Sequence, residues 1–340
     1  MNKRLFKKPF LYIALIAGPL LIIVVSLFIG RYPLSFSEVF TALGFKLGLV
    51  QEPVPSTHLN VVWDVRLSRA ILGTLVGASL AVSGASFQGM FRNPLVSANI
   101  LGVTSGAGFG AALAIILFDG QTLFIYLFAF GFGLIAVVLS YLIGTTYKAT
   151  PTVMLVLGGV VVSSIFSALI SLLKYIADPF NQLPSIVFWL MGSLASARFS
   201  DTLIAAIPMS IGVVGLLLMR WRLNVLSLGD IEARALGLNV FVAKSLAIFF
   251  ATLATAGAVC VSGIIGWVGL VIPHIGRMLV GNNNEALIPV TISLGAGYLV
   301  IVDNIARTLT GSEIPLGILT SLIGGPFFIY LIRRTKARGW

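Results

Sequence analysis

The chain has 340 residues, of which 58% are hydrophobic and only 10% are charged, a composition that excludes a soluble globular protein. The formal net charge of +11 would by itself suggest binding to nucleic acid. Most of the 22 Lys and Arg residues, however, fall in loops that an inside N-terminus places in the cytoplasm. Because this bias sets the orientation of membrane proteins, the charge indicates topology, with both termini cytoplasmic, and no nucleic-acid partner.

Several apolar stretches are long enough to cross a bilayer core, which takes about 20 residues. The first follows basic residues, as in a signal peptide, but it is longer than the ~7–15 apolar residues of such a peptide, and we expect it to remain as an anchor. Two later stretches contain polar residues, glycine or proline, and we expect Pro273 to break the second of them. The predicted spans are residues 10–30, 70–87, 95–117, 123–144, 153–173, 203–219, 245–261, 264–280, 286–302 and 314–332.

These spans predict an all-α polytopic membrane protein with about ten transmembrane helices. We expect residues 1–340 to form a single transmembrane domain. Its longest outer segment, about residues 31–69, contains a possible short helix at 35–47. Residues 186–195 are too few to span the membrane and predict a short helix at the outer mouth.

Many of the 36 glycines fall inside the predicted spans, most densely at residues 101–110. Small residues let helix backbones approach closely in lipid, so we expect these glycines to serve helix packing. The alternative is a phosphate-binding loop, but no strand precedes the run and no GxxxxGK[ST] motif occurs in the chain. The missing motif predicts that the chain does not hydrolyse ATP itself.

The largest polar break, about residues 226–238, reads LSLGDIEARALG from Leu226 to Gly237. Asp230 is a candidate N-cap for a short helix, and it would face Arg234 one turn later. Gly229 and Gly237 permit sharp turns at the two ends.

The apolar residues of this break, among them Ile231 and Leu236, would give the short helix an apolar side. An amphipathic element of this size suits a groove on another protein. A solvated connector between two spans is the alternative. The lone Cys260 and the distant His58 and His274 predict no metal site.

Four further stretches, together with the polar break, resemble one family. They are RLSR at 66–69 followed by VGASLAVSGA at 76–85, RNPL at 92–95 followed by LGV at 101–103 and the glycine run, SGIIGWVGLVIPH at 262–274, and EIPLG at 313–317. In this order and spacing they resemble the membrane (permease) subunits of bacterial type II ABC importers of the FecCD-like family. These importers take up iron siderophores, haem or vitamin B12. The resemblance covers the chain from Trp63 onward.

The resemblance implies ten membrane helices in each of two permease subunits around a central path, the second being identical or a close paralogue. It also implies two cytoplasmic ABC ATPase subunits, which use ATP and Mg, so that this chain binds no cofactor and is not an enzyme. The expected location is the bacterial cytoplasmic (inner) membrane. The residues expected to couple the permease to the ATPases are Leu228, Gly229, Asp230, Ile231, Ala233, Arg234, Leu236 and Gly237.

In the same family an extracytoplasmic substrate-binding protein docks through arginines on the permease. Arg66, Arg69 and Arg307 match those positions, and arginine forms bidentate pairs with carboxylates. Asp64 and Asp303 lie close in sequence and would compete for the same arginines. Interfacial arginines that only extend toward water are the alternative.

An ion-gradient-driven secondary transporter is the competing class, since the interrupted spans 95–117 and 264–280 loosely resemble its paired broken helices. Ion coupling needs charged groups in mid-membrane, whereas the charges here are predicted at the ends of spans. For the cargo, the resemblance favours a ferric siderophore, and haem, cobalamin and oxyanions such as molybdate stay open.

Overall fold

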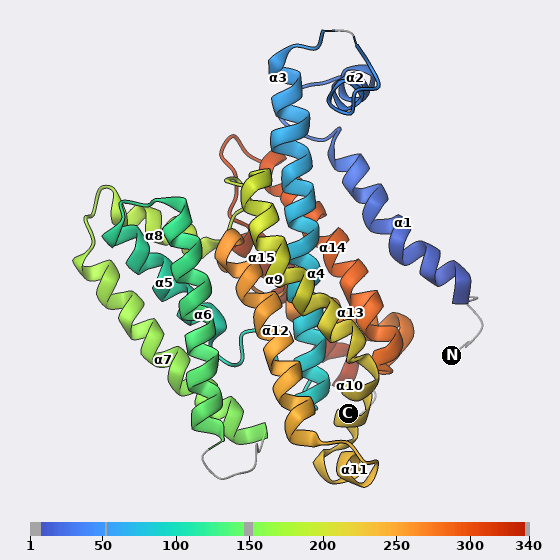
Figure 1. Cartoon of the computed structure of the whole chain (residues 1–340), viewed down its shortest axis with the longest axis vertical. Helices are drawn as coiled ribbons and strands as arrows, with labels where there is room; N and C mark the ends of the chain where they lie inside the picture. The colour runs from blue at the N-terminus through green and yellow to red at the C-terminus, as the bar shows by residue number, and fades with distance from the viewer. Residues whose placement is uncertain (1–7, 52, 146–151, 337–340) are drawn as a thin grey trace.

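The computed structural model describes residues 8–51, 53–145 and 152–336, and this part of the chain consists of helices and loops, without a strand (Figure 1). The elements are α1 (Lys8–Ser26), α2 (Phe36–Lys46), α3 (Ser56–Leu59), the π-helical η1 (Asn60–Leu67), α4 (Ser68–Phe91), α5 (Val103–Leu117), α6 (Thr122–Gly144), α7 (Thr152–Ile176), α8 (Gln182–Met191), α9 (Phe199–Leu218), α10 (Arg220–Leu228), α11 (Asp230–Ala235), α12 (Val240–Ser262), α13 (Val268–Val280), α14 (Asn284–Thr308) and α15 (Leu316–Lys336).

Every predicted span contains one of these helices, so the prediction of an all-α polytopic membrane protein is confirmed. Within the described residues, 6 helices are long and apolar enough to cross a bilayer: α4 with its continuation α3–η1, α6, α7, α9, α12 and α14. The other four spans contain shorter apolar helical segments: Ile13–Ser26 of α1, Val103–Leu117 of α5, Val268–Val280 of α13 and Leu316–Leu331 of α15.

The two predicted short helices outside the spans are both present. α2 begins with a capping box: Ser35 Oγ accepts from the Glu38 N–H at 3.3 Å, and the Glu38 carboxylate accepts from the Ser35 N–H at 2.7 Å. The hydrogen bond from the Ser35 N–H, and to a smaller extent that from its hydroxyl, holds the pKa of the Glu38 carboxyl below its ordinary value. α8 begins at Gln182, before the predicted residue 186, and ends at Met191.

The expectation that Pro273 breaks its helix is wrong, because α13 continues through it. A proline ring removes the donor for the carbonyl four residues earlier, which here belongs to Gly269. That carbonyl accepts a hydrogen bond of 3.1 Å from Gln88 Nε2 of α4 instead. Arg277 donates to the other end of the Gln88 amide, Oε1, at 2.5 Å. A neighbouring helix thus satisfies the backbone group that the proline frees, as a membrane interior requires.

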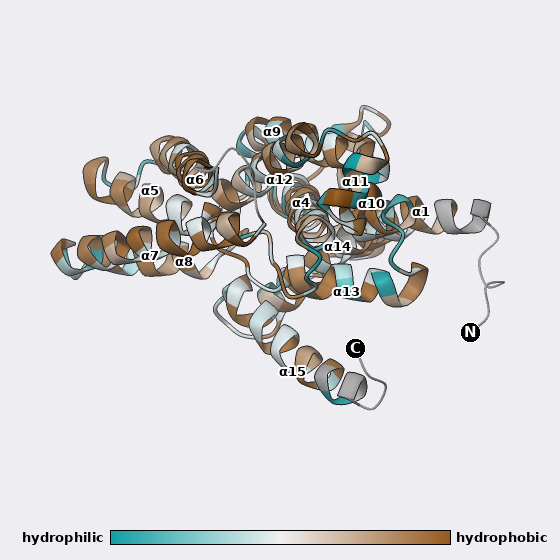
Figure 2. Ribbon diagram, turned by 90° about the horizontal axis from the view of Figure 1, so that it is seen from below, coloured by the Kyte–Doolittle hydropathy of each residue, from teal (hydrophilic) through white to brown (hydrophobic). Residues whose placement is uncertain are grey.

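α4 is the central helix of the bundle. It packs against α9, α12, α13 and α14 (Figures 1 and 2). Nearly all of its side chains are buried. Helices α5 to α8 form a group on one side, which meets the centre where α5 and α6 contact α12. α15 extends away from the central helices and contacts α8, α13 and α14 (Figure 2).

Glycines on α4, α5 and α14 place helix backbones in direct contact. A Cβ at Gly77 of α4 would overlap the carbonyl oxygen of Gly295 on α14, and a Cβ at Gly295 would overlap that of Gly77. In the predicted glycine run, Gly106 and Gly110 of α5 lie in the same way against carbonyls of α6. The expectation that the run serves helix packing is therefore confirmed, and such contacts supply the van der Waals energy that holds helices together in lipid.

We expect Gly77→Ala to lower the free energy of unfolding by about 1–3 kcal/mol, the usual effect of overpacking, because α4 and α14 must move apart. Gly131→Ala in α6 is the matched control, since no atom lies within 4 Å of a Cβ there. Alanine favours a helix more than glycine does, so the control should be neutral or slightly stabilised. Thermal unfolding in detergent measures both, and equal midpoints for the two variants would contradict the packing argument.

Candidate functional site

The polar break between α9 and α12 folds as α10, α11 and two glycine turns. Gly229 separates the helices with φ +130° and ψ 163°, a backbone region that is essentially open to glycine alone. After α11, Gly237 has φ +79°. Its N–H donates to Arg234 O at 2.9 Å, and the Leu238 N–H donates to Ala233 O at 3.0 Å, which together form a Schellman motif. The sharp turns predicted at both glycines are present.

Exposed side chains at α11 are apolar at Ile231 and charged at Glu232 and Arg234. α11 lies at the lower end of the molecule, beyond the ends of the long helices (Figure 1). Ile231 is 77% exposed, and Leu228 and Leu236 are exposed beside it. Ala233 faces the opposite way and is buried in the core. The short helix and its two ends therefore present three large apolar side chains outward, beside charged ones, while Ala233 packs against the bundle, and such an amphipathic element suits a groove on another protein.

Asp230 does not cap α11, which corrects the role expected from the sequence. The N-cap is Gly229, and no side chain bonds to the free N–H groups there. Asp230 Oδ2 instead accepts from Lys244 Nζ of α12 at 2.7 Å, and within the described part of the chain Asp230 forms no ion pair with Arg234. The reason is burial: the Lys244 side chain is only 1% exposed, so its charge requires a partner more than the exposed helix end does.

A second contact joins this region to the core. Asn224 of α10 donates to Asn283 Oδ1 at 2.8 Å and accepts from the backbone N–H of Asn284 at 2.6 Å, at the start of α14. α11 is thus tied to α12 through Lys244, and α10 is tied to α14. Sequence reasoning missed both ties, because neither an apolar-flanked lysine nor a pair of asparagines distant in the chain has a distinctive pattern.

The Lys244–Asp230 pair predicts an asymmetry between its two partners. Asp230→Ala leaves a buried ammonium without its carboxylate and should destabilise the fold by about 2 kcal/mol, below the 3–5 kcal/mol of a fully buried pair. Lys244→Met should have a smaller effect, because the Asp230 side chain is 34% exposed and can be hydrated. Chemical unfolding of the two variants measures the difference. Equal losses would contradict the assignment of the buried charge to Lys244.

Around the start of α4 and the end of α14, the arginines predicted to dock a binding protein are buried. Arg66, Arg69 and Arg307 are 2%, 4% and 6% exposed. Arg66 donates to the backbone oxygens of Leu27 and Tyr32, at 2.7 and 2.5 Å. Both carbonyls belong to the segment that follows α1, so Arg66 connects this segment to the start of α4.

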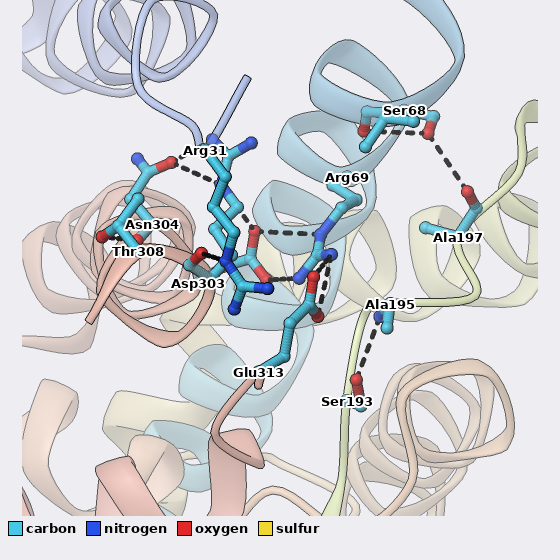
Figure 3. Close-up of polar contacts among 12 residues, drawn as sticks. Arg31, Ser68, Arg69, Ser193, Ala195, Ala197, Asp303, Asn304, Thr308 and Glu313 are labelled. Carbon is cyan, nitrogen blue, oxygen red and sulfur yellow. Dashed lines mark hydrogen bonds and ion pairs between the residues drawn. The ribbon is translucent and has the colours of Figure 1, made fainter. Parts of the chain in front are cut away.

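Arg69 lies between two carboxylates (Figure 3). Its guanidinium is 2.7 Å from Asp303 Oδ1 of α14 and 2.8 Å from Glu313 Oε1 in the loop before α15. Asp303 also lies 3.8 Å from Arg307 Nε. The competition of Asp303 for these arginines, expected from the sequence, is therefore present, whereas Asp64 forms no ion pair with a described residue.

Arg307 and Arg31 complete this outer network. Arg307 donates to Asn304 Oδ1 and to the backbone oxygen of Ser26 at 2.9 Å. Arg31, also drawn in Figure 3, donates to three carbonyls at the end of α14, those of Arg307, Thr310 and Gly311, at 2.7–2.8 Å. These arginines thus bind their own chain and fix α1, α4 and α14 to one another. This geometry gives no support to the docking role, which stays a prediction.

We expect Arg69→Met to lower the free energy of unfolding by about 3 kcal/mol, because it leaves the buried Asp303 carboxylate without its closest partner. Adding Asp303→Leu should recover part of that loss, since the stranded charge is then removed. Unfolding in detergent tests this pair of variants. Unchanged stability, combined with loss of binding to an external protein, would instead favour docking as the function of Arg69.

No group of three or more His, Cys, Asp or Glu side chains in the described ranges is placed to hold a metal ion. The buried charged residues there lie in two sets: the arginines with Asp303 around the start of α4 and the end of α14, and Lys244 near the start of α12.

The fold defines a multi-pass, all-α membrane protein with a short, exposed helix, α11, at one end. The chain belongs to the FecCD transport family, which it matches over residues 18–334. It is 45% identical over 317 residues to the molybdate import system permease protein of Haemophilus influenzae, covering 93% of each chain. It is 40% identical over 322 residues to a permease named for iron chelatin transport in Helicobacter pylori, covering 94% of this chain and 97% of the relative.

A solved structure of a metal-chelate type ABC transporter in an inward-facing conformation has the same fold. Its TM-score is 0.85 at 42% identity, over 96% of this chain and 100% of the other. The predicted resemblance to the permease subunits of type II ABC importers is confirmed by these findings. The chain is accordingly a permease subunit of an ABC transporter of this family.

Proposed function

We propose that this chain forms one half of the translocation path of an ATP-driven importer. The importer has two cytoplasmic ATPase subunits, each of which binds the α11 helix of one permease subunit. The observation that carries the proposal is the group of exposed apolar side chains at α11 and its two ends, next to the turns at Gly229 and Gly237. A second permease subunit, identical or a close paralogue, would complete the path. In this proposal the ATPase subunits bind ATP and Mg and hydrolyse the ATP, and this chain performs no covalent chemistry.

Two contacts of α10 and α11, the Asp230–Lys244 ion pair and the hydrogen bonds of Asn224, suggest how movement of the ATPases reaches the path. A displacement of α11 acts on α12 through Asp230 and Lys244, which are 2.7 Å apart. A displacement of α10 acts on the start of α14 through Asn224. Both receiving helices pack against the central α4, so the motion is delivered to the middle of the bundle. Closure of the ATPases would thereby switch the path from outward-open to inward-open.

For the cargo we propose a ferric siderophore, in agreement with the relative named for iron chelatin transport. Molybdate is the second candidate, because the relative named for molybdate import is 45% identical over most of both chains. Haem and cobalamin stay open as well. A substrate-binding protein outside the membrane would make the first selection.

Docking of that binding protein through Arg66, Arg69 and Arg307 requires their guanidinium groups to leave the partners that they bind in this structure. We therefore place the docking surface around this network and treat the three arginines as the groups that hold it in shape. The proposed location is the bacterial cytoplasmic membrane, with α11 and both termini on the inner side. The terminal residues 1–7 and 337–340 lie outside the described residues.

A secondary transporter is the alternative function, and identifying the partners of the chain distinguishes it from an ATP-driven importer. We would purify the tagged chain from its native membranes and identify the copurifying proteins by mass spectrometry. A P-loop ATPase and a solute-binding protein are the expected partners. Recovery of the chain alone, still able to transport along an ion gradient without ATP, would overturn the proposal.

The two glycine turns provide a matched test of coupling. Gly229→Asn should separate ATP hydrolysis from transport and lower transport at least tenfold, because asparagine cannot readily adopt φ +130° with ψ 163°. Gly237→Asn should retain most transport, since asparagine is common at the left-handed C′ position of a Schellman motif. ATPase activity and uptake are measured side by side in proteoliposomes. Full transport by the Gly229 variant would contradict the coupling role.

A further inference from the structure

α1 is held to the bundle chiefly at its outer end. There Arg66 and Arg307 bind the carbonyls of Leu27 and Ser26. From that point α1 runs along α14, its main neighbour, and diverges from the bundle toward its N-terminal end (Figure 1). The divergence leaves space beside α1 that the described side chains do not fill.

A groove of about 600 Å³ occupies the side of α1 that faces α9. Its walls are formed by α1, α4, α9 and α14 and are almost entirely apolar. They include Leu15 and Pro19 from α1, Leu75 from α4, and Val213 and Leu217 from α9. These helix segments lie within the predicted spans, so the groove opens into the hydrocarbon region of the bilayer. An apolar groove at that depth is filled by acyl chains, because water gains no hydrogen bonds there.

One end of the groove is basic. Arg220 lines it at the point where α9 has ended and α10 begins. Its side chain is exposed, and it forms no hydrogen bond or ion pair with any residue that the structure describes. Trp221, 55% exposed, and the exposed Arg222 follow it. Tryptophan beside arginine is typical of the membrane–water interface, and basic residues on the cytoplasmic side attract anionic headgroups.

We propose that this groove binds an anionic phospholipid of the inner leaflet, with an acyl chain between α1 and α9 and its phosphate on Arg220. Arginine suits the phosphate because its planar guanidinium donates two parallel hydrogen bonds. The lipid would fill the space between α1 and the bundle. It would also hold the start of α10, the helix that leads to α11, so bound lipid would stabilise the coupling region.

The test is lipid retention by the full chain, purified with the subunits that copurify and incubated with mixed vesicles of phosphatidylglycerol and phosphatidylcholine. Native mass spectrometry then counts each lipid that remains bound. The wild-type protein should retain phosphatidylglycerol preferentially. Arg220→Ala should retain about fivefold less of it, which corresponds to ~1 kcal/mol for one basic side chain at an anionic surface. Arg220→Lys, which keeps the charge, should retain most of it.

Arg222→Ala is the matched control, because Arg222 is exposed on the same helix but does not line the groove. It should retain phosphatidylglycerol as the wild type does. Ser210→Trp, which places a large side chain in the groove, should lower retention of both lipids. Equal retention by wild type and Arg220→Ala, equal retention of the two lipids by the wild type, or an equal loss in Arg222→Ala would each overturn the proposal. None of these results depends on which cargo the importer carries.

Discussion

The constraint on which this structure depends is that helices in a bilayer must attract one another without help from the hydrophobic effect. Lipid tails are as apolar as leucine, so the attraction comes from close backbone packing and from polar groups that find partners inside the protein. α4 meets this constraint with Gly77 against Gly295 and Gly84 against the backbone of Gly269. The central position of α4 follows from these contacts, because they let α13 and α14 pack directly against its backbone.

The same constraint explains the buried polar groups. Gln88 satisfies the carbonyl that Pro273 frees and binds Arg277, so one amide allows a proline to remain inside α13. Around the start of α4 and the end of α14, arginines satisfy carbonyls at and beyond helix termini. At the other end of the bundle, Lys244 is neutralised by a carboxylate of the short helix α11. Because α11 supplies the counter-charge of Lys244 in α12, a displacement of α11 affects the core, and this is the physical basis of the proposed coupling.

The sequence allowed the spans to be predicted, because hydropathy averaged over some 20 residues is insensitive to individual contacts. It allowed the family to be predicted because several short motifs occur in the family's order and spacing. It also allowed the turns at Gly229 and Gly237 to be predicted, since glycine there has a local conformational cause. It did not predict the partners of Asp230, for which Arg234 at helical spacing was as reasonable as Lys244 farther along the chain. The burial of Arg66 was equally hidden, because its acceptors are backbone carbonyls, which every residue type provides.

The central claim is that cargo movement through this chain is driven by ATP hydrolysed in partner subunits bound at α11. Uptake of cargo into proteoliposomes that contain the chain and its copurified partners tests this claim most directly, with ATP supplied on the ATPase side and ionophores added in parallel. The account predicts uptake that requires ATP and that ionophores leave unchanged. Uptake without ATP that an ionophore abolishes would contradict it.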